Sequence, residues 1–168
     1  GIYEPFEVKQ TISPSMDIQV ASNFERLLFD VCLRDSNKVS QLMDSLSKSG
    51  KFILDKESLK EIRKTFASDS LSEDDTKTII KETYKNQKIL VDPHTAVAIG
   101  VANKFKLEGE TIVLSTAHPA KFYDAVMKET DIKPELPENL KNILSKKEKY
   151  EKLPRDLKEI KNYILKRV

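Results

Sequence analysis

The stretch Thr111–Phe122, TIVLSTAHPAKF, decides the expected fold of this chain. Its first four residues form a short apolar run with β-branched members, a pattern that predicts a buried strand. Pro119 suits the first turn of a helix, where its missing N–H would have no partner anyway. Apolar residues recur at helical spacing behind it. We therefore predict a strand, a tight turn and a helix, within an α/β chain that is mostly helical.

The turn between strand and helix carries the side chains with the most obvious chemistry. In open α/β sheets, ligands bind just outside the carboxyl ends of strands. The predicted turn places three polar residues at such a point: Ser115, Thr116 and His118. Serine and threonine also occupy turns for purely structural reasons. The residues alone leave both interpretations open.

Length and composition set outer limits on function. A chain of 168 residues is long enough for one domain with its own core. Its net charge of +2 gives no reason to expect nucleic acid binding, and no apolar run approaches the length of a membrane span. The single cysteine, Cys32, excludes an internal disulfide and favours a reducing cytoplasm. Two histidines without a carboxylate pattern predict no metal site.

The first half of the chain predicts short strands and amphipathic helices. Val8–Ile12 and Lys51–Leu54 are expected to be extended. Ser22 and Glu25 form a capping-box pattern at the start of one helix, and Gly50 is expected to end the next. Two further helices are expected to begin after the capping residues Asp55 and Ser72.

The residues before the quoted stretch predict a strand followed by a buried helix. Lys88–Val91 is expected to form the strand, and Asp92 to cap a helix that has proline at its first position. This helix is apolar or small nearly all round, so we expect it to be buried. Gly100 in its interior predicts a close packing contact. After residue 131 we expect a connector and short helices, the last of them amphipathic.

Three segments together resemble the threonine synthases. They are TAHPAKF at 116–122, SPSMDIQVASNFER at 13–26 and DPHTAVAIG at 92–100. The resemblance implies the C-terminal portion of a fold-type-II, tryptophan-synthase-β-like enzyme that depends on pyridoxal phosphate (PLP). Residues 1–130 would then belong to the PLP domain, with a helical segment at 37–86, and 131–168 would form a helical tail.

The same resemblance implies roles for particular residues. The Thr116 hydroxyl would hydrogen-bond the pyridine nitrogen of PLP. The other residues expected on the cofactor side are Ser115, His118, Asp92, His94 and Thr95. Those expected on the substrate side, where O-phosphohomoserine would bind, are Ser13, Ser15, Asp17 and Asn23. No lysine here matches the motif that binds PLP in this family, so we name no catalytic residue.

The absence of that lysine motif leaves two hypotheses for the chain. One is that it belongs to a complete threonine synthase and is inactive by itself. The other is that it is a remnant that has lost catalysis and serves as a folded binding module. The start at Gly1 fits either a processed end or the later part of a longer protein. An apolar face left uncovered in the isolated chain would favour a homodimer.

Overall fold

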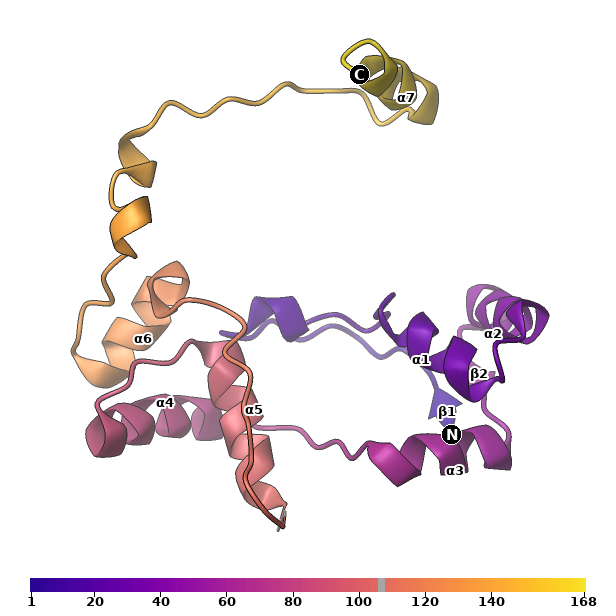
Figure 1. Cartoon of the computed structure of the whole chain (residues 1–168), viewed down its shortest axis with the longest axis horizontal. Helices are drawn as coiled ribbons and strands as arrows, with labels where there is room; N and C mark the ends of the chain where they lie inside the picture. The colour runs from indigo at the N-terminus through magenta and orange to yellow at the C-terminus, as the bar shows by residue number, and fades with distance from the viewer. Residues whose placement is uncertain (106–107) are drawn as a thin grey trace. The chain divides into compact units, whose positions relative to one another are not determined.

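The computed structural model describes residues 1–105 and 108–168, and it divides them into two compact units, 1–134 and 135–168. The first unit holds most of the regular structure (Figure 1). Its helices are α1 (Phe24–Val31), α2 (Ser36–Ser49), α3 (Lys56–Thr65), α4 (Glu73–Gln87), α5 (Pro93–Lys104) and α6 (Tyr123–Thr130). Its 3₁₀ turns are η1 (Pro14–Met16) and η2 (Pro119–Phe122).

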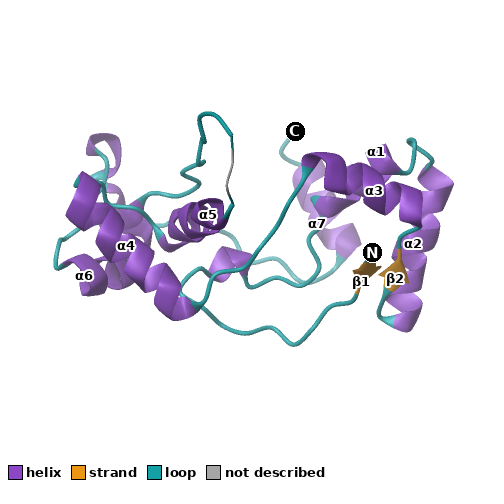
Figure 2. Cartoon of the chain, turned by 90° about the horizontal axis from the view of Figure 1, so that it is seen from below, coloured by secondary structure: helices purple, strands orange, loops and turns teal. Residues whose placement is uncertain are grey.

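Helices dominate the described residues, and the one sheet among them is a two-stranded antiparallel ribbon (Figure 2). It pairs β1 (Ile2–Tyr3) with β2 (Phe52–Ile53), so that Tyr3 lies opposite Phe52. The prediction that Lys51–Leu54 is extended is therefore confirmed at its centre.

The other three predicted strands are wrong. Val8–Ile12, Lys88–Val91 and Thr111–Leu114 have no regular secondary structure. Ile112 and Leu114 are 85% and 73% exposed, so the last of these segments is not buried either. A strand satisfies its backbone groups only through a neighbouring strand, and none of the described residues pairs with these segments. The apolar pattern alone could not supply that neighbour.

Most of the predicted helix starts and ends are confirmed, because they depend on nearby residues. Asp55 accepts a hydrogen bond from the backbone N–H of Ser58 at 2.8 Å, and Ser72 caps α4 in the same way. Gly50 ends α2 at a φ of 76°, in the left-handed region that glycine adopts at little cost. The capping box at the start of α1 is wrong: Asn23 occupies the cap position, and no side chain caps the helix.

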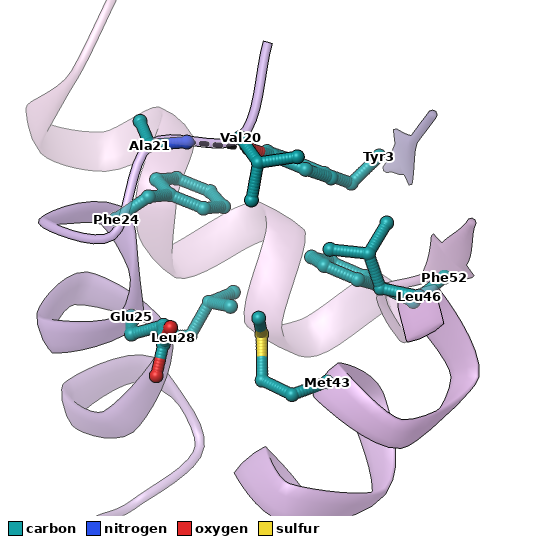
Figure 3. Close-up of a pocket in the computed structure, with 9 residues that line it drawn as sticks. All are labelled: Tyr3, Val20, Ala21, Phe24, Glu25, Leu28, Met43, Leu46 and Phe52. Atoms are coloured by element: carbon teal, nitrogen blue, oxygen red, sulfur yellow. Dashed lines mark hydrogen bonds between the residues drawn. The ribbon is translucent and has the colours of Figure 1, made fainter. Parts of the chain in front are cut away.

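One group of elements in the first unit packs around Tyr3 (Figure 3). Its ring stacks on Phe52 at 4.9 Å and on Phe24 at 5.5 Å between centroids. The Tyr3 hydroxyl accepts from the Ala21 N–H at 3.1 Å and donates to the Gln19 carbonyl at 2.9 Å. These two bonds use both hydrogen-bonding capacities of the partly buried phenol, and they tie the loop before α1 to the ribbon.

A second group is built on α4, which contacts both α5 and α6. Its core contains Ile80, Val91 and Ala96, all buried. Gly100 of α5 faces Leu71, as the predicted close contact requires: a Cβ at Gly100 would lie 2.5 Å from a Leu71 methyl carbon. The prediction that α5 is buried is confirmed for its first four residues and for Gly100, whereas residues 97–99 and 101–102 are only partly buried and the last two are exposed.

The second unit contains α7 (Leu157–Leu165), which confirms the predicted final helix. Before it, where the sequence predicts another short helix after the connector, the chain forms two 3₁₀ turns instead, η3 (Glu138–Leu140) and η4 (Ile143–Ser145). No helix in the described part of the chain combines the length and apolarity needed to cross a membrane.

Candidate functional site

The buried start of α5 forms the centre of the candidate site. Asp92 caps the helix and is fully shielded from solvent. Its carboxylate accepts hydrogen bonds from the backbone N–H groups of His94 and Thr95, at 2.9 and 3.3 Å. It also contacts the Thr95 hydroxyl and, at 2.8 Å, Nδ1 of His94. The carboxylate therefore fixes the orientation of both side chains that follow the proline.

His94 joins three segments that are far apart in the sequence. Its Nε2 accepts a hydrogen bond from the backbone N–H of Ser15 at 3.1 Å. Its ring lies 4.7 Å from the ring of Phe122, tilted by 57°. The three sequence segments that carry the family resemblance thus meet around one imidazole.

The Thr11–Asp17 loop, which contains η1, is closed on itself. Both carboxylate oxygens of Asp17 accept from Thr11, from its N–H at 2.8 Å and from its hydroxyl at 2.7 Å. Ser13 is buried, and its hydroxyl lies 3.0 Å from that of Thr11. The carboxylate of Glu73 in α4 accepts from the backbone N–H of Ile12 at 3.2 Å. The loop is therefore a defined unit with anchors on α4 and α5.

A groove of about 360 Å³ runs along α5 beside His94. Ala98 and Ala102 lie four residues apart on the same helix face, and their small side chains let another segment come close. Thr116 is part of the lining, and it lies on the segment that follows residues 106–107, which the structure does not describe. The complete lining consists of Met16, His94, Ala98, Ala102, Thr111, Ile112, Val113, Leu114 and Thr116. Its polar groups are few: an imidazole and the hydroxyls of two threonines.

The predicted site residues only partly come together. Thr116 and His94 line the groove, Asp92 and Thr95 bond to each other behind it, and Ser15 binds His94. Ser115 and His118 flank Thr116 without lining the groove; Nδ1 of His118 accepts from the Ala120 N–H at 3.2 Å and so caps η2.

Asn23 is separated from this group by its packing. It stands at the start of α1, whose main packing partners among the helices are α2 and α3.

Three residues of the groove are not among the predicted site residues: Met16, Ala98 and Ala102. The pattern of small residues in α5 predicts only burial. Their spacing of four residues on a helix was the available signal, because two small residues on one face leave room for a ligand or a segment.

Comparisons with known proteins find similarity to one family of enzymes. A family model described as threonine synthase, C-terminal, matches residues 95–164. The threonine synthase of Pseudomonas aeruginosa is 36% identical over an alignment that covers 96% of this chain and 35% of that enzyme. The chain is related to the C-terminal part of threonine synthases. This confirms the resemblance inferred from the three sequence segments.

Solved threonine synthase structures agree with the sequence comparison. The PLP-bound threonine synthase from Brucella melitensis matches with a TM-score of 0.84 and 41% identity, over 98% of this chain and 36% of that one. Yeast threonine synthase matches with a TM-score of 0.77 and 33% identity, over 98% and 38%. These matches confirm the predicted fold class. The chain spans about a third of the length of the threonine synthases that it matches.

Proposed function

We propose that this chain forms the C-terminal part of a threonine synthase, which converts O-phosphohomoserine and water to threonine and phosphate with PLP as cofactor. In this proposal the chain supplies the wall of the cleft that faces the PLP ring. The observation that carries the proposal is the groove itself: Thr116 and His94 line it together along the small-residue face of α5. A buried lone thiol at Cys32 suits a cytoplasmic enzyme.

The residues present fit a planar aromatic cofactor. The groove volume, about 360 Å³, falls within the range of small-molecule sites. Ala98 and Ala102 offer a flat apolar surface for a ring, and the Thr116 hydroxyl supplies a polar group on the same lining. None of the described residues that line the groove is a lysine, and no lysine of the chain matches the family's PLP-binding motif, so in this proposal the lysine that binds PLP comes from another part of the enzyme.

Each residue has a role that follows from its chemistry. Bound PLP supplies an electron sink for the reaction. In the proposal, the Thr116 hydroxyl holds the pyridine nitrogen by a hydrogen bond. A hydroxyl gives up its proton far less readily than a carboxylic acid, so this nitrogen stays largely unprotonated and the electron sink is moderated. Asp92, His94 and Thr95 stand beside the ring, with the Asp92 carboxylate fixing the other two.

The substrate side of the proposal rests on the loop next to His94. Ser15 has an exposed side chain beside the imidazole, which makes it the best placed of the four predicted substrate residues. Ser13 and Asp17 shape the loop through Thr11, because their side-chain oxygens already contact that residue. Asn23 belongs to the group of elements packed around Tyr3, so the packing gives less support to a direct contact between Asn23 and the substrate.

A chimeric enzyme tests the proposal. Residues 1–168 replace the matching C-terminal part of the P. aeruginosa threonine synthase, and phosphate release from O-phosphohomoserine is measured after PLP loading. We expect turnover, and we expect Thr116→Ala to lower kcat/KM by roughly 2- to 10-fold, since one neutral hydrogen bond is worth about 0.5–1.5 kcal/mol. Thr78→Ala, at an exposed position on α4, is the matched control and should leave turnover unchanged.

Two results would contradict the proposal. One is a folded, PLP-loaded chimera without turnover, which would favour the binding-module alternative. The other is an equal effect of the two threonine variants, which would remove Thr116 from the site.

A further inference from the structure

Both ring nitrogens of His94 are already engaged within the protein. The carboxylate oxygen of Asp92 nearest to Nδ1 can only accept a hydrogen bond, so the proton on the ring belongs on Nδ1. Nε2 faces the backbone N–H of Ser15, which can only donate, so Nε2 carries no proton. The network therefore assigns the neutral Nδ1–H tautomer. No ring nitrogen is left to bind a cofactor or a substrate.

The bond from Ser15 to His94 bridges 79 residues of sequence and attaches the loop to the start of α5. A second anchor is Ile12, whose N–H donates to Glu73 on α4 and whose side chain packs against the core cluster of Ile80, Val91 and Ala96. Between these anchors the loop holds its own shape through Asp17 and Thr11. With Ile12 held on α4, the His94 bond holds the Ser15 side of this closed loop to α5.

Met16 shows why that position matters for the groove. It follows Ser15 directly and lines the groove together with Ala98 and Thr116. A shift of the loop away from α5 would carry Met16 with it and open one wall of the groove. The imidazole thus controls the shape of a site that its own ring also lines.

We infer that His94 is a positioning residue: with Asp92 behind it, its neutral imidazole holds the Ser15 side of the Thr11–Asp17 loop against α5 and so fixes the substrate-side wall of the groove. The catalytic consequence of this inference rests on the proposed function. Its structural part does not, because it concerns contacts within the chain alone.

A matched pair of substitutions separates the two bonds of the ring. In His94→Gln, the longer side chain places an amide oxygen near the former position of Nε2, where it can accept from Ser15. In His94→Asn, the shorter side chain places its amide group near the former position of Nδ1, where it can donate to Asp92 but cannot reach Ser15. A residue that merely supported the helix start through Asp92 would tolerate Asn at least as well as Gln.

The direct measurement is amide hydrogen exchange of Ser15, by NMR on the full 168-residue chain. In the wild type we expect this exposed residue to have a protected amide. Exchange should become about 2- to 10-fold faster in His94→Asn, the effect of losing one hydrogen bond, and should stay close to wild type in His94→Gln. The Ala96 amide, bonded to the Asp92 carbonyl at 2.9 Å, reports whether the first turn of α5 stays intact and should not change.

Kinetics in the chimera test the consequence. His94→Asn should raise KM for O-phosphohomoserine by more than it lowers kcat, and His94→Gln should have a KM nearer to that of the parent. The inference is overturned if the wild-type Ser15 amide is unprotected, or if Asn and Gln affect it equally. An inactive parent chimera would instead count against the proposed function, while the exchange data would still decide the role of His94.

Discussion

Replacing the buried carboxylate of Asp92 should destabilise the protein far more than replacing an exposed helix cap. In Asp92→Ala the helix loses its cap, which costs about 0.5–2 kcal/mol. The His94 Nδ1–H and the Thr95 hydroxyl also lose their acceptor in a place where both side chains are buried. A buried polar group without a partner costs about 1–3 kcal/mol. Because losses within one network are not additive, we expect a total loss of about 3–5 kcal/mol in the free energy of unfolding, in the lower part of the simple sum of about 2.5–8 kcal/mol.

Asp35→Ala is the matched control for this prediction. Asp35 caps α2 by accepting from the N–H groups of Asn37 and Lys38, at 2.9 and 3.2 Å, and it is exposed. The Asp35→Ala substitution should lower the free energy of unfolding by only about 1 kcal/mol, the usual loss for a cap. The difference between the two variants, about 2–4 kcal/mol, isolates the buried network.

Urea unfolding followed by the helical circular dichroism signal measures both variants. Because urea slopes for small proteins are about 1–3 kcal/mol per molar, the two midpoints should differ by roughly 1 M or more. Amide exchange at Ala96 and Gly50, each bonded to a carbonyl one helical turn back, reports α5 and α2 separately. Equal losses for Asp92→Ala and Asp35→Ala would refute the reasoning, since the burial of the network would then carry no energetic weight.

Three further predictions concern the isolated chain. It should show no saturable PLP binding, because one Thr116 hydrogen bond contributes about 0.5–1.5 kcal/mol whereas association costs about 4 kcal/mol or more; borohydride trapping with mass mapping checks this, and stoichiometric labelling of one lysine that weakens in Thr116→Ala would disprove it. Exposed apolar residues such as Ile112 and Leu114 should drive dimer formation or dye binding, and a compact monomer by light scattering that binds no apolar dye would contradict this. Lys38 donates a hydrogen bond to Asp55 at 2.6 Å, and this bond is the main cause of the lowered pKa of the Asp55 carboxyl. Because the folded pKa lies below the unfolded value of about 3.9, this stabilisation is complete above that pH and is lost as the pH falls further. The free energies of unfolding of wild type and Asp55→Asn should therefore converge as the pH is lowered, and a difference that stays constant with pH would rule out this linkage.

Local sequence determined the helices of this protein and most of their ends. Asp55, Ser72 and Asp92 cap helices by bonding to N–H groups two or three residues away, so the residues that decide each start are neighbours in the chain. Gly50 ends α2 because its own backbone can adopt a positive φ. The family was also visible in the sequence, through three short segments that the comparisons then confirmed.

Tertiary structure alone decided the strands and the connections within the site. The apolar run at Thr111–Leu114 satisfied the pattern of a strand, yet a strand also needs a partner, and the pattern carries no information about one. The bond between Ser15 and His94 likewise joins residues 79 positions apart. Such a contact depends on how α4, α5 and the loop pack together, and no spacing within one segment encodes that packing.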